Sequence, residues 1–183
     1  MESTETQGIK KFTNAPSEFR NEVQKRTYQA LAELGIPFER VDNKPAATME
    51  ECLEIEKILG VKVIKSLFLC NRQQTQFYLF MTEGDKPFST KNFGHALNIS
   101  RVSFAPEEKL RNMMGVEFGA TTLFSLLMDT DKKVRFIVDK DVLTHEYISI
   151  PDGTVTCYMK VPAHEAIEKI AALMGHDATI IEV

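Results

Sequence analysis

The sequence predicts an α+β domain in which helices pack around a mixed, largely antiparallel, barrel-like sheet. Helical and strand-like segments follow one another without the regular alternation that a doubly wound parallel sheet requires. Two polar links, residues 71–74 and 130–133, each join strand-like segments as hairpin turns do. The 183 residues are 43% hydrophobic and 26% charged, which is the balance of a single globular domain.

We expect residues 1–16 to form a flexible tail and residues 17–183 to form the domain. The tail shows no periodicity and ends in a proline, after which Ser17 can cap a helix. Further along, Thr48 and Glu51 have the spacing of a capping box, in which each side chain binds a backbone N–H of the helix start. Glycines mark the helix ends. The expected helices are residues 17–35, 48–60, 89–97, 106–115 and 162–175.

Strands are expected where β-branched and aromatic residues alternate with polar ones or form short apolar runs. Residues 123–129 and 134–139 flank a polar turn, so we expect them to pair as an antiparallel hairpin. The expected strands are residues 36–41, 61–70, 76–83, 101–105, 123–129, 134–139, 147–150, 155–161 and 178–183.

Lys65 interrupts one face of an otherwise apolar strand, a face that it shares with Val63, Leu67 and Leu69. An ammonium buried without a partner is strongly destabilising, so the side chain either extends to solvent or meets an oxygen-bearing group. Two interpretations therefore remain open. Lys65 is a surface lysine on a half-exposed strand, or it lines a pocket that binds a phosphate, carbonyl or hydroxyl oxygen.

Residues 119–122 (G-A-T-T) form a link of small residues before an apolar segment. Small side chains leave successive backbone N–H groups free to bind an oxyanion or a carbonyl. An ordinary turn leading into a strand explains the same residues. The sequence contains no phosphate-binding P-loop and no GxGxxG motif.

Other chemistry finds little support in the sequence. The four histidines and three cysteines show no metal-binding spacing and no disulfide framework, and Ser66 and Ser103 lack a nucleophile elbow. We therefore expect no metal and no cofactor. The polar N-terminus lacks a signal sequence and the longest apolar run is short, so we expect a cytoplasmic protein without a membrane partner.

The charge distribution is uneven along the chain. The net charge of −4 argues against non-specific coating of nucleic acid. Residues 57–111, however, carry nine Lys or Arg against four Asp or Glu, which permits a basic face on an acidic protein.

Short motifs follow one another along the chain in a characteristic order. The first half carries G-I-P-F at 35–38, K-P at 44–45, T-M-E-E at 48–51 and V-I-K-S-L-F-L at 63–69. The second half carries V-S-F-A at 102–105 and M-G-V-E at 114–117, followed by Gly119. This order resembles the YbaK-like aminoacyl-tRNA editing domain, and within it the free-standing, prolyl-tRNA-synthetase-associated (ProX-type) deacylases. The resemblance covers about residues 22–183.

The resemblance implies hydrolysis, in trans, of the ester between a wrong amino acid and tRNA, with Ala-tRNA(Pro) as the expected substrate. Water is the implied nucleophile, and the 3′-aminoacylated end of tRNA the implied partner, with prolyl-tRNA synthetase as a second one. Lys65 corresponds to the family's strand lysine and is the implied catalytic residue. The implied substrate-binding residues are Ser66, Gly119, Ala120, Thr121, Thr122, Leu123, Ile150 and Pro151.

Three positions differ from the usual family pattern. Ser66 replaces an asparagine, Leu123 the proline of the GxxxP loop, and Ile150 a pocket histidine. With Ile150 in the pocket we expect a tighter and more apolar site, suited to a small aliphatic amino acid. The alternative is a catalytically weakened tRNA- or synthetase-binding module of the same fold. A ligand-binding relative that regulates an amino-acid pathway is a third reading.

Overall fold

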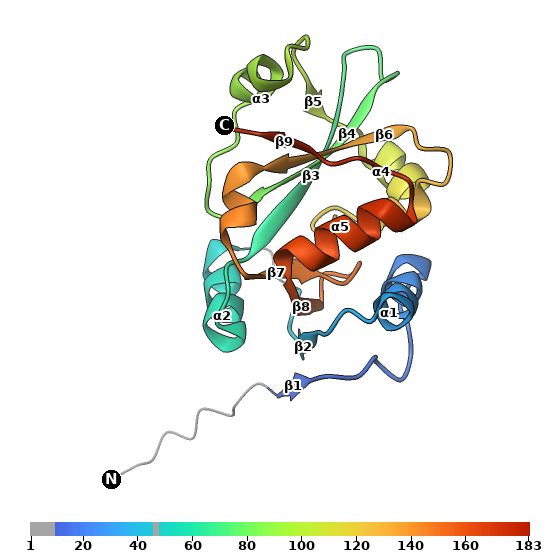
Figure 1. The fold of residues 1–183 in the computed structure, drawn as a ribbon, viewed down its shortest axis with the longest axis vertical. Coiled ribbons are helices and arrows are strands. Elements are labelled where there is room, and N and C mark those ends of the chain that lie inside the picture. Colours follow the sequence, from blue (N-terminus) through green and yellow to red (C-terminus); the bar gives the residue numbers. More distant parts are fainter. Residues whose placement is uncertain (1–9, 46–47) are drawn as a thin grey trace.

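Two β-sheets and the helices around them make up the fold (Figure 1). The computed structural model describes residues 10–45 and 48–183. In the four-stranded sheet the order is β1 (Lys11–Phe12), β2 (Glu39–Asp42), β8 (Cys157–Pro162) and β7 (Tyr147–Pro151). In the five-stranded sheet the order is β5 (Ser103–Phe104), β3 (Ile64–Cys70), β4 (Phe77–Glu83), β6 (Val134–Asp139) and β9 (Thr179–Ile181).

The sheets meet where the start of β3 approaches β7. There Val63 and Ser149 form an isolated parallel bridge, and the Ser149 N–H donates to the Lys62 carbonyl at 2.9 Å. The predicted α+β class is confirmed, but the two sheets do not close into a barrel. The first sheet is antiparallel throughout, whereas β6 lies parallel to both β4 and β9 in the second.

The helices begin and end largely where local signals place them. Thr48 and Glu51 form the expected capping box, with the Glu51 N–H donating to Thr48 Oγ1 and the Thr48 N–H to Glu51 Oε2. Gly35, Gly60 and Gly115 adopt the left-handed conformation at helix ends. The helices are α1 (Glu22–Leu34), α2 (Met49–Leu59), α3 (Thr90–Leu97), α4 (Glu107–Met114) and α5 (Ala163–Leu173).

The N-terminal part differs from the prediction. The first helix is capped by Asn21 instead of Ser17, because the Asn21 side chain accepts the Gln24 N–H at 2.8 Å and donates to the Gly153 carbonyl at 2.8 Å. Residues 1–9 of the expected tail lie outside the described residues. Within the rest of the expected tail, Lys11–Phe12 pairs with β2 at the edge of the sheet.

The expected strand over residues 123–129 is wrong. These residues form a 3₁₀ helix, η1 (Leu123–Met128), and β6 pairs with β4 in parallel in place of a hairpin. Every residue from 123 to 127 is buried, so the segment shows no alternation, and such a run fits a buried helix as well as a buried strand. The Thr122 N–H donates to Ser125 Oγ at 3.2 Å and starts the helical turn.

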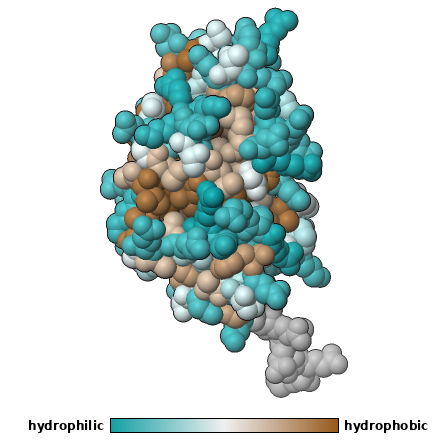
Figure 2. Space-filling view, turned by 90° about the vertical axis from the view of Figure 1, so that its right-hand side faces the viewer, coloured by the Kyte–Doolittle hydropathy of each residue, from teal (hydrophilic) through white to brown (hydrophobic). Residues whose placement is uncertain are grey.

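The apolar core has two main parts, one on each face of β3 and β4. Ile64, Phe68 and Cys70 face the larger part, which also includes η1 and side chains of α1, α4 and α5. Leu69 faces the smaller part, which includes Phe93 of α3. Apolar side chains also reach the surface, and on the face shown in Figure 2 they gather across the middle among polar ones.

Candidate functional site

A cavity of about 390 Å³ lies where α2, β3, the end of β5 and the loop 118–121 meet. Most of its lining is apolar. The polar side chains on its wall include Lys65, Ser66, Asp85, Thr121 and Tyr158. A concave apolar site with a few converging polar groups is the usual form of a small-molecule or cofactor site.

Lys65 is a half-buried residue on β3 that lines this cavity. Its Nζ donates to the backbone carbonyl of Lys86 at 2.6 Å. Burial lowers the pKa of Lys65, and the nearby carboxylate of Asp85 opposes that effect. An ammonium group has three donors, so the bond to Lys86 leaves others for oxygens of a bound molecule. The structure therefore places Lys65 in a cavity wall, which fits the pocket interpretation and not the surface one.

The carbonyl that binds Lys65 is held in place by a buried ionic contact. Lys86 Nζ bonds to Asp139 Oδ2 at 2.7 Å and to Asp141 Oδ2 at 2.9 Å. Asp139 is fully buried at the end of β6, where it also accepts from Thr82 Oγ1 at 2.8 Å. No sequence signal connects Lys86 with Asp139, because they are 53 residues apart.

Ser66 is a buried polar residue of the cavity wall. It is 8% exposed, and its Oγ has no hydrogen-bond partner among the residues that the structure describes. Along this edge of β3, β5 pairs with Leu69 and Cys70, and the Ala105 N–H donates to the Phe68 carbonyl. Because backbone groups alternate in direction along a strand, the Ser66 N–H points to the same edge. Within the described ranges no strand pairs with Ser66 there, so this N–H faces the cavity region.

The loop after α4 forms another part of the wall. The Ala120 N–H donates to the Glu117 carbonyl at 3.0 Å, which closes a turn with Gly119 at φ +90°. A type II turn needs a positive φ at its third residue, and glycine supplies it without strain. Thr122 Oγ1 then donates to the Pro151 carbonyl at 2.6 Å. This bond ties the loop to the end of β7, so two parts of the wall are fixed together.

The catalytic residue and the substrate-binding residues expected from the resemblance divide into two groups. Lys65, Ser66, Gly119, Thr121 and Pro151 all line the cavity. The others are buried away from its lining, and they are Ala120, Thr122, Leu123 and Ile150.

Their positions have simple structural causes. Ile150 precedes Pro151 on β7, and because side chains alternate along a strand it points into the main core. Leu123 opens η1 and is likewise in the core. Neither of these two departures from the family pattern therefore changes the cavity wall directly.

Several wall residues are not among the site residues that the sequence predicts. Phe104 lies in the expected strand 101–105, but its side chain is 54% exposed, and Leu53 and Phe118 are 50% and 78% exposed. Cys52 and Tyr158 hydrogen-bond to each other, and burial raises the pKa of both groups. A large aromatic residue directly before a turn glycine, as in Phe118-Gly119, is the signal that could have identified one of them.

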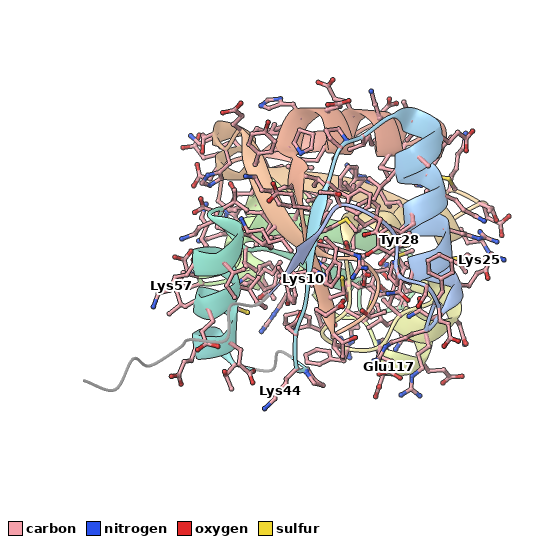
Figure 3. All side chains as sticks on the ribbon, turned by 90° about the horizontal axis from the view of Figure 1, so that it is seen from below. Lys10, Lys25, Tyr28, Lys44, Lys57 and Glu117 are labelled. Atoms are coloured by element: carbon pink, nitrogen blue, oxygen red, sulfur yellow. The ribbon has the colours of Figure 1, made fainter. Side chains whose placement is uncertain are left out.

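The basic segment is partly neutralised by ion pairs. Lys62 pairs with Asp85, Lys86 with Asp139, and Arg111 with Glu107. Lys57 projects outward from α2 (Figure 3). The nine positive charges of residues 57–111 therefore do not all contribute to one open basic face.

Within residues 10–45 and 48–183, no three or more His, Cys, Asp or Glu side chains come together in a way that could hold a metal ion. No helix in these ranges combines the length and the apolar character needed to cross a membrane.

Comparison with known proteins identifies the family. The chain is 26% identical over 155 residues to the prolyl-tRNA editing protein ProX of Acetoanaerobium sticklandii, covering 84% of this chain and 93% of that protein. It is 27% identical over 172 residues to the prolyl-tRNA synthetase associated domain-containing protein 1 of Mus musculus, covering 91% and 98%. A crystal structure of a protein proposed to be a trans-editing enzyme for prolyl tRNA synthetase has the same fold, with a TM-score of 0.62 at 16% identity over 90% and 99% of the chains. The profile of the aminoacyl-tRNA editing domain matches residues 43–168. Because this match spans well over half of the chain, the protein belongs to the aminoacyl-tRNA editing domain family, as its motif order predicts.

Proposed function

We propose that this protein is a deacylase that hydrolyses misacylated tRNA in trans, with Ala-tRNA(Pro) as its substrate. Family membership and the relatives named for prolyl-tRNA editing support this proposal. The observation that carries it for this chain is the Lys65 ammonium, which lies in the wall of an apolar cavity beside the Ser66 hydroxyl, a group with no hydrogen-bond partner among the described residues. Such a cavity suits a small aliphatic group attached to an oxygen-rich end.

In the proposed complex, Lys65 donates to an oxygen of the terminal ribose, its phosphate or the ester. A charge-assisted hydrogen bond of this kind is roughly twice as strong as a neutral one. In this proposal the Ser66 N–H and hydroxyl orient the amino-acid carbonyl and stabilise the oxyanion that develops on it as water attacks; the oxyanion then collapses and releases the tRNA hydroxyl. Water is the nucleophile. Positioning, together with the substrate's own hydroxyl, supplies much of the rate.

The size of the amino acid explains why a second site is useful. In a synthetase pocket built for proline, the smaller alanine binds with only about 1–3 kcal/mol less free energy than proline does. This difference gives a selectivity of roughly 10- to 200-fold. A smaller site on another protein can then hydrolyse the alanyl ester of the tRNA that the synthetase has mischarged. The apolar lining around Ile64, Phe68 and Leu110 excludes polar amino acids in this scheme.

The test is release of alanine from Ala-tRNA(Pro) by the wild type, Lys65→Ala and a matched control, Lys57→Ala. Lys57 lies in the same basic segment but projects outward from α2. We expect Lys65→Ala to lose at least about 100-fold in kcat/KM, as oxyanion-site deletions do, and Lys57→Ala to retain activity. Equal rates for Lys65→Ala and the wild type would refute the role of Lys65. A wild type inactive on a panel of small-aminoacyl tRNAs would refute the activity.

A non-catalytic tRNA- or synthetase-binding module is the second candidate. The departures from the family pattern at Ser66, Leu123 and Ile150 motivate it, and of these three residues only Ser66 lines the cavity. It predicts salt-dependent tRNA binding without turnover. Robust turnover by the wild type excludes it. Stabilisation by a free amino acid but not by tRNA would instead indicate a ligand-binding regulator.

A further inference from the structure

The mouth of the cavity carries an unusual concentration of exposed apolar surface. Among the described residues, the three most exposed large apolar side chains are Phe118 at 78%, Phe104 at 54% and Leu53 at 50%. All three line this one cavity, although they come from the loop after α4, from β5 and from α2. Exposed apolar groups that gather in this way mark a binding surface, whereas isolated ones are common on any protein.

Phe118 is presented by its backbone. It is the second residue of the turn that the Ala120 N–H and the Glu117 carbonyl close, directly before Gly119. The second residue of a tight turn lies at its corner. Because most of its surface is in solvent, the Phe118 ring contributes little to the stability of the fold. Contact with a bound molecule is the explanation that remains for its position.

Phe104 is held more firmly. It lies opposite Leu69 in the pairing of β5 with β3, and its ring meets the ring of Phe88 edge-on at 5.7 Å. Edge-to-face contacts of this kind fix the orientation of an aromatic ring. Half of the Phe104 surface nevertheless remains exposed, so a fixed ring is available to a bound molecule at the cavity mouth.

We propose that Phe104 and Phe118 form a stacking platform for the unpaired bases at the 3′ end of the tRNA. This inference rests on the proposed function, in which the aminoacyl group enters the cavity and the attached nucleotides stay at its mouth. Single-stranded ends are recognised by bases stacking on aromatic side chains, and an ammonium such as that of Lys65 complements the neighbouring phosphate or ribose oxygens. Aromatic rings at the mouth and a cation on the wall together match a nucleotide better than an apolar peptide.

Variants of Phe118 separate stacking from simple apolar contact. Phe118→Leu keeps an apolar side chain without a ring, whereas Phe118→Trp keeps a ring. Phe19→Ala is the matched control, because Phe19 is 41% exposed, stacks on Tyr28 and does not line the cavity. The loss of one base stack is expected to raise the KM for mischarged tRNA by roughly 5- to 150-fold. Phe118→Leu and Phe104→Ala should show this loss, and Phe118→Trp and Phe19→Ala should not.

A second readout does not depend on hydrolysis. An acceptor-stem hairpin RNA with 2-aminopurine at its 3′ end loses fluorescence when that base stacks on a ring. We expect quenching with the wild type and Phe118→Trp, and none with Phe118→Leu.

Equal quenching and equal KM for Phe118→Leu would overturn the stacking platform while leaving the deacylase proposal intact. Concentration-dependent dimerisation that Phe118→Ala abolishes, with an unchanged KM, would assign the patch to self-association and overturn it too. A wild type that quenches the probe without any turnover would refute the deacylase alone.

Discussion

Replacing Lys86 with methionine tests whether the buried ionic contact behind the cavity stabilises the fold and positions Lys65. Lys86 Nζ bonds to Asp139 Oδ2 at 2.7 Å, and the Asp139 side chain is 0% exposed whereas that of Lys86 is 22% exposed. Removing one partner of a buried ion pair costs about 3–5 kcal/mol, because the other charge stays buried without compensation. Water can reach part of this site, and Asp139 still accepts the hydrogen bond from Thr82. We therefore expect Lys86→Met to lower the free energy of unfolding by about 2–3 kcal/mol.

Urea unfolding at pH 7 measures this loss in Lys86→Met. A double-mutant cycle with Asp139→Asn isolates the contact, since asparagine still accepts from Thr82 but carries no charge to compensate. We expect Lys86→Met to be less destabilising in the Asp139→Asn background than in the wild type. Additive effects of the two substitutions would refute the reasoning.

The stability effect has a defined pH dependence. Burial opposes the charge on Lys86, but hydrogen bonds to Asp139 and Asp141 outweigh it and raise the pKa of Lys86 above its ordinary value of 10.5. A group whose pKa is raised on folding contributes stability that is fully present below its unfolded pKa and is lost as the pH rises through its folded pKa. The difference between wild type and Lys86→Met should therefore stay constant between pH 6 and 9 and narrow only above about 10.5.

The same substitution should impair deacylation. The Lys86 carbonyl that binds Lys65 Nζ remains in Lys86→Met, but the segment that carries it loses its anchor on Asp139. A displacement of about 1 Å in a catalytic group costs up to about 100-fold in rate. We expect kcat to fall by about 10- to 100-fold, with a smaller change in KM. Lys86→Arg, which can still reach Asp139, should restore most of the rate.

Two further substitutions test the cavity and the backbone. Asp85→Asn removes the negative charge that offsets the effect of burial on Lys65, so the pKa of Lys65 should fall further. The alkaline limb of the pH profile of kcat/KM should then move to lower pH. An unmoved limb would show that Lys65 does not act as an ammonium. Gly153→Ala should destabilise the protein by about 2–4 kcal/mol in urea unfolding, because Gly153 has φ +104° and an added Cβ would lie 2.8 Å from Val23 Cγ1. Gly35→Ala is its control, with φ +66° and no atom within 4 Å, and should cost only about 1 kcal/mol; equal losses would contradict the steric argument.

Local patterns pointed to Lys65 and to the link 119–122, whereas the other expected site residues came from the order of motifs along the chain. The position of Lys65 among apolar neighbours on one strand face predicts a lysine in unusual surroundings, and the structure places it in the cavity wall. The link of small residues predicts free backbone N–H groups. Gly119 and Thr121 line the same cavity, but the N–H groups of Ala120 and Thr122 bond to the Glu117 carbonyl and to Ser125 Oγ. Ile150 was harder to place, because a one-residue shift along a strand moves a side chain to the other face. Pro151 lines the cavity and Ile150 does not.

The sequence alone determined features that local patterns, or the order of motifs along the chain, encode. These include the capping box of Thr48 and Glu51, the hairpin of β3 and β4, and the motif order that identifies the family. Tertiary structure alone decided the parallel pairing of β6 with β4, the 3₁₀ helix in place of a strand, and the contact of Lys86 with Asp139. Periodicity and capping depend on neighbours along the chain, whereas the conformation of a buried apolar run and the partners of a buried charge depend on which distant segments pack against them.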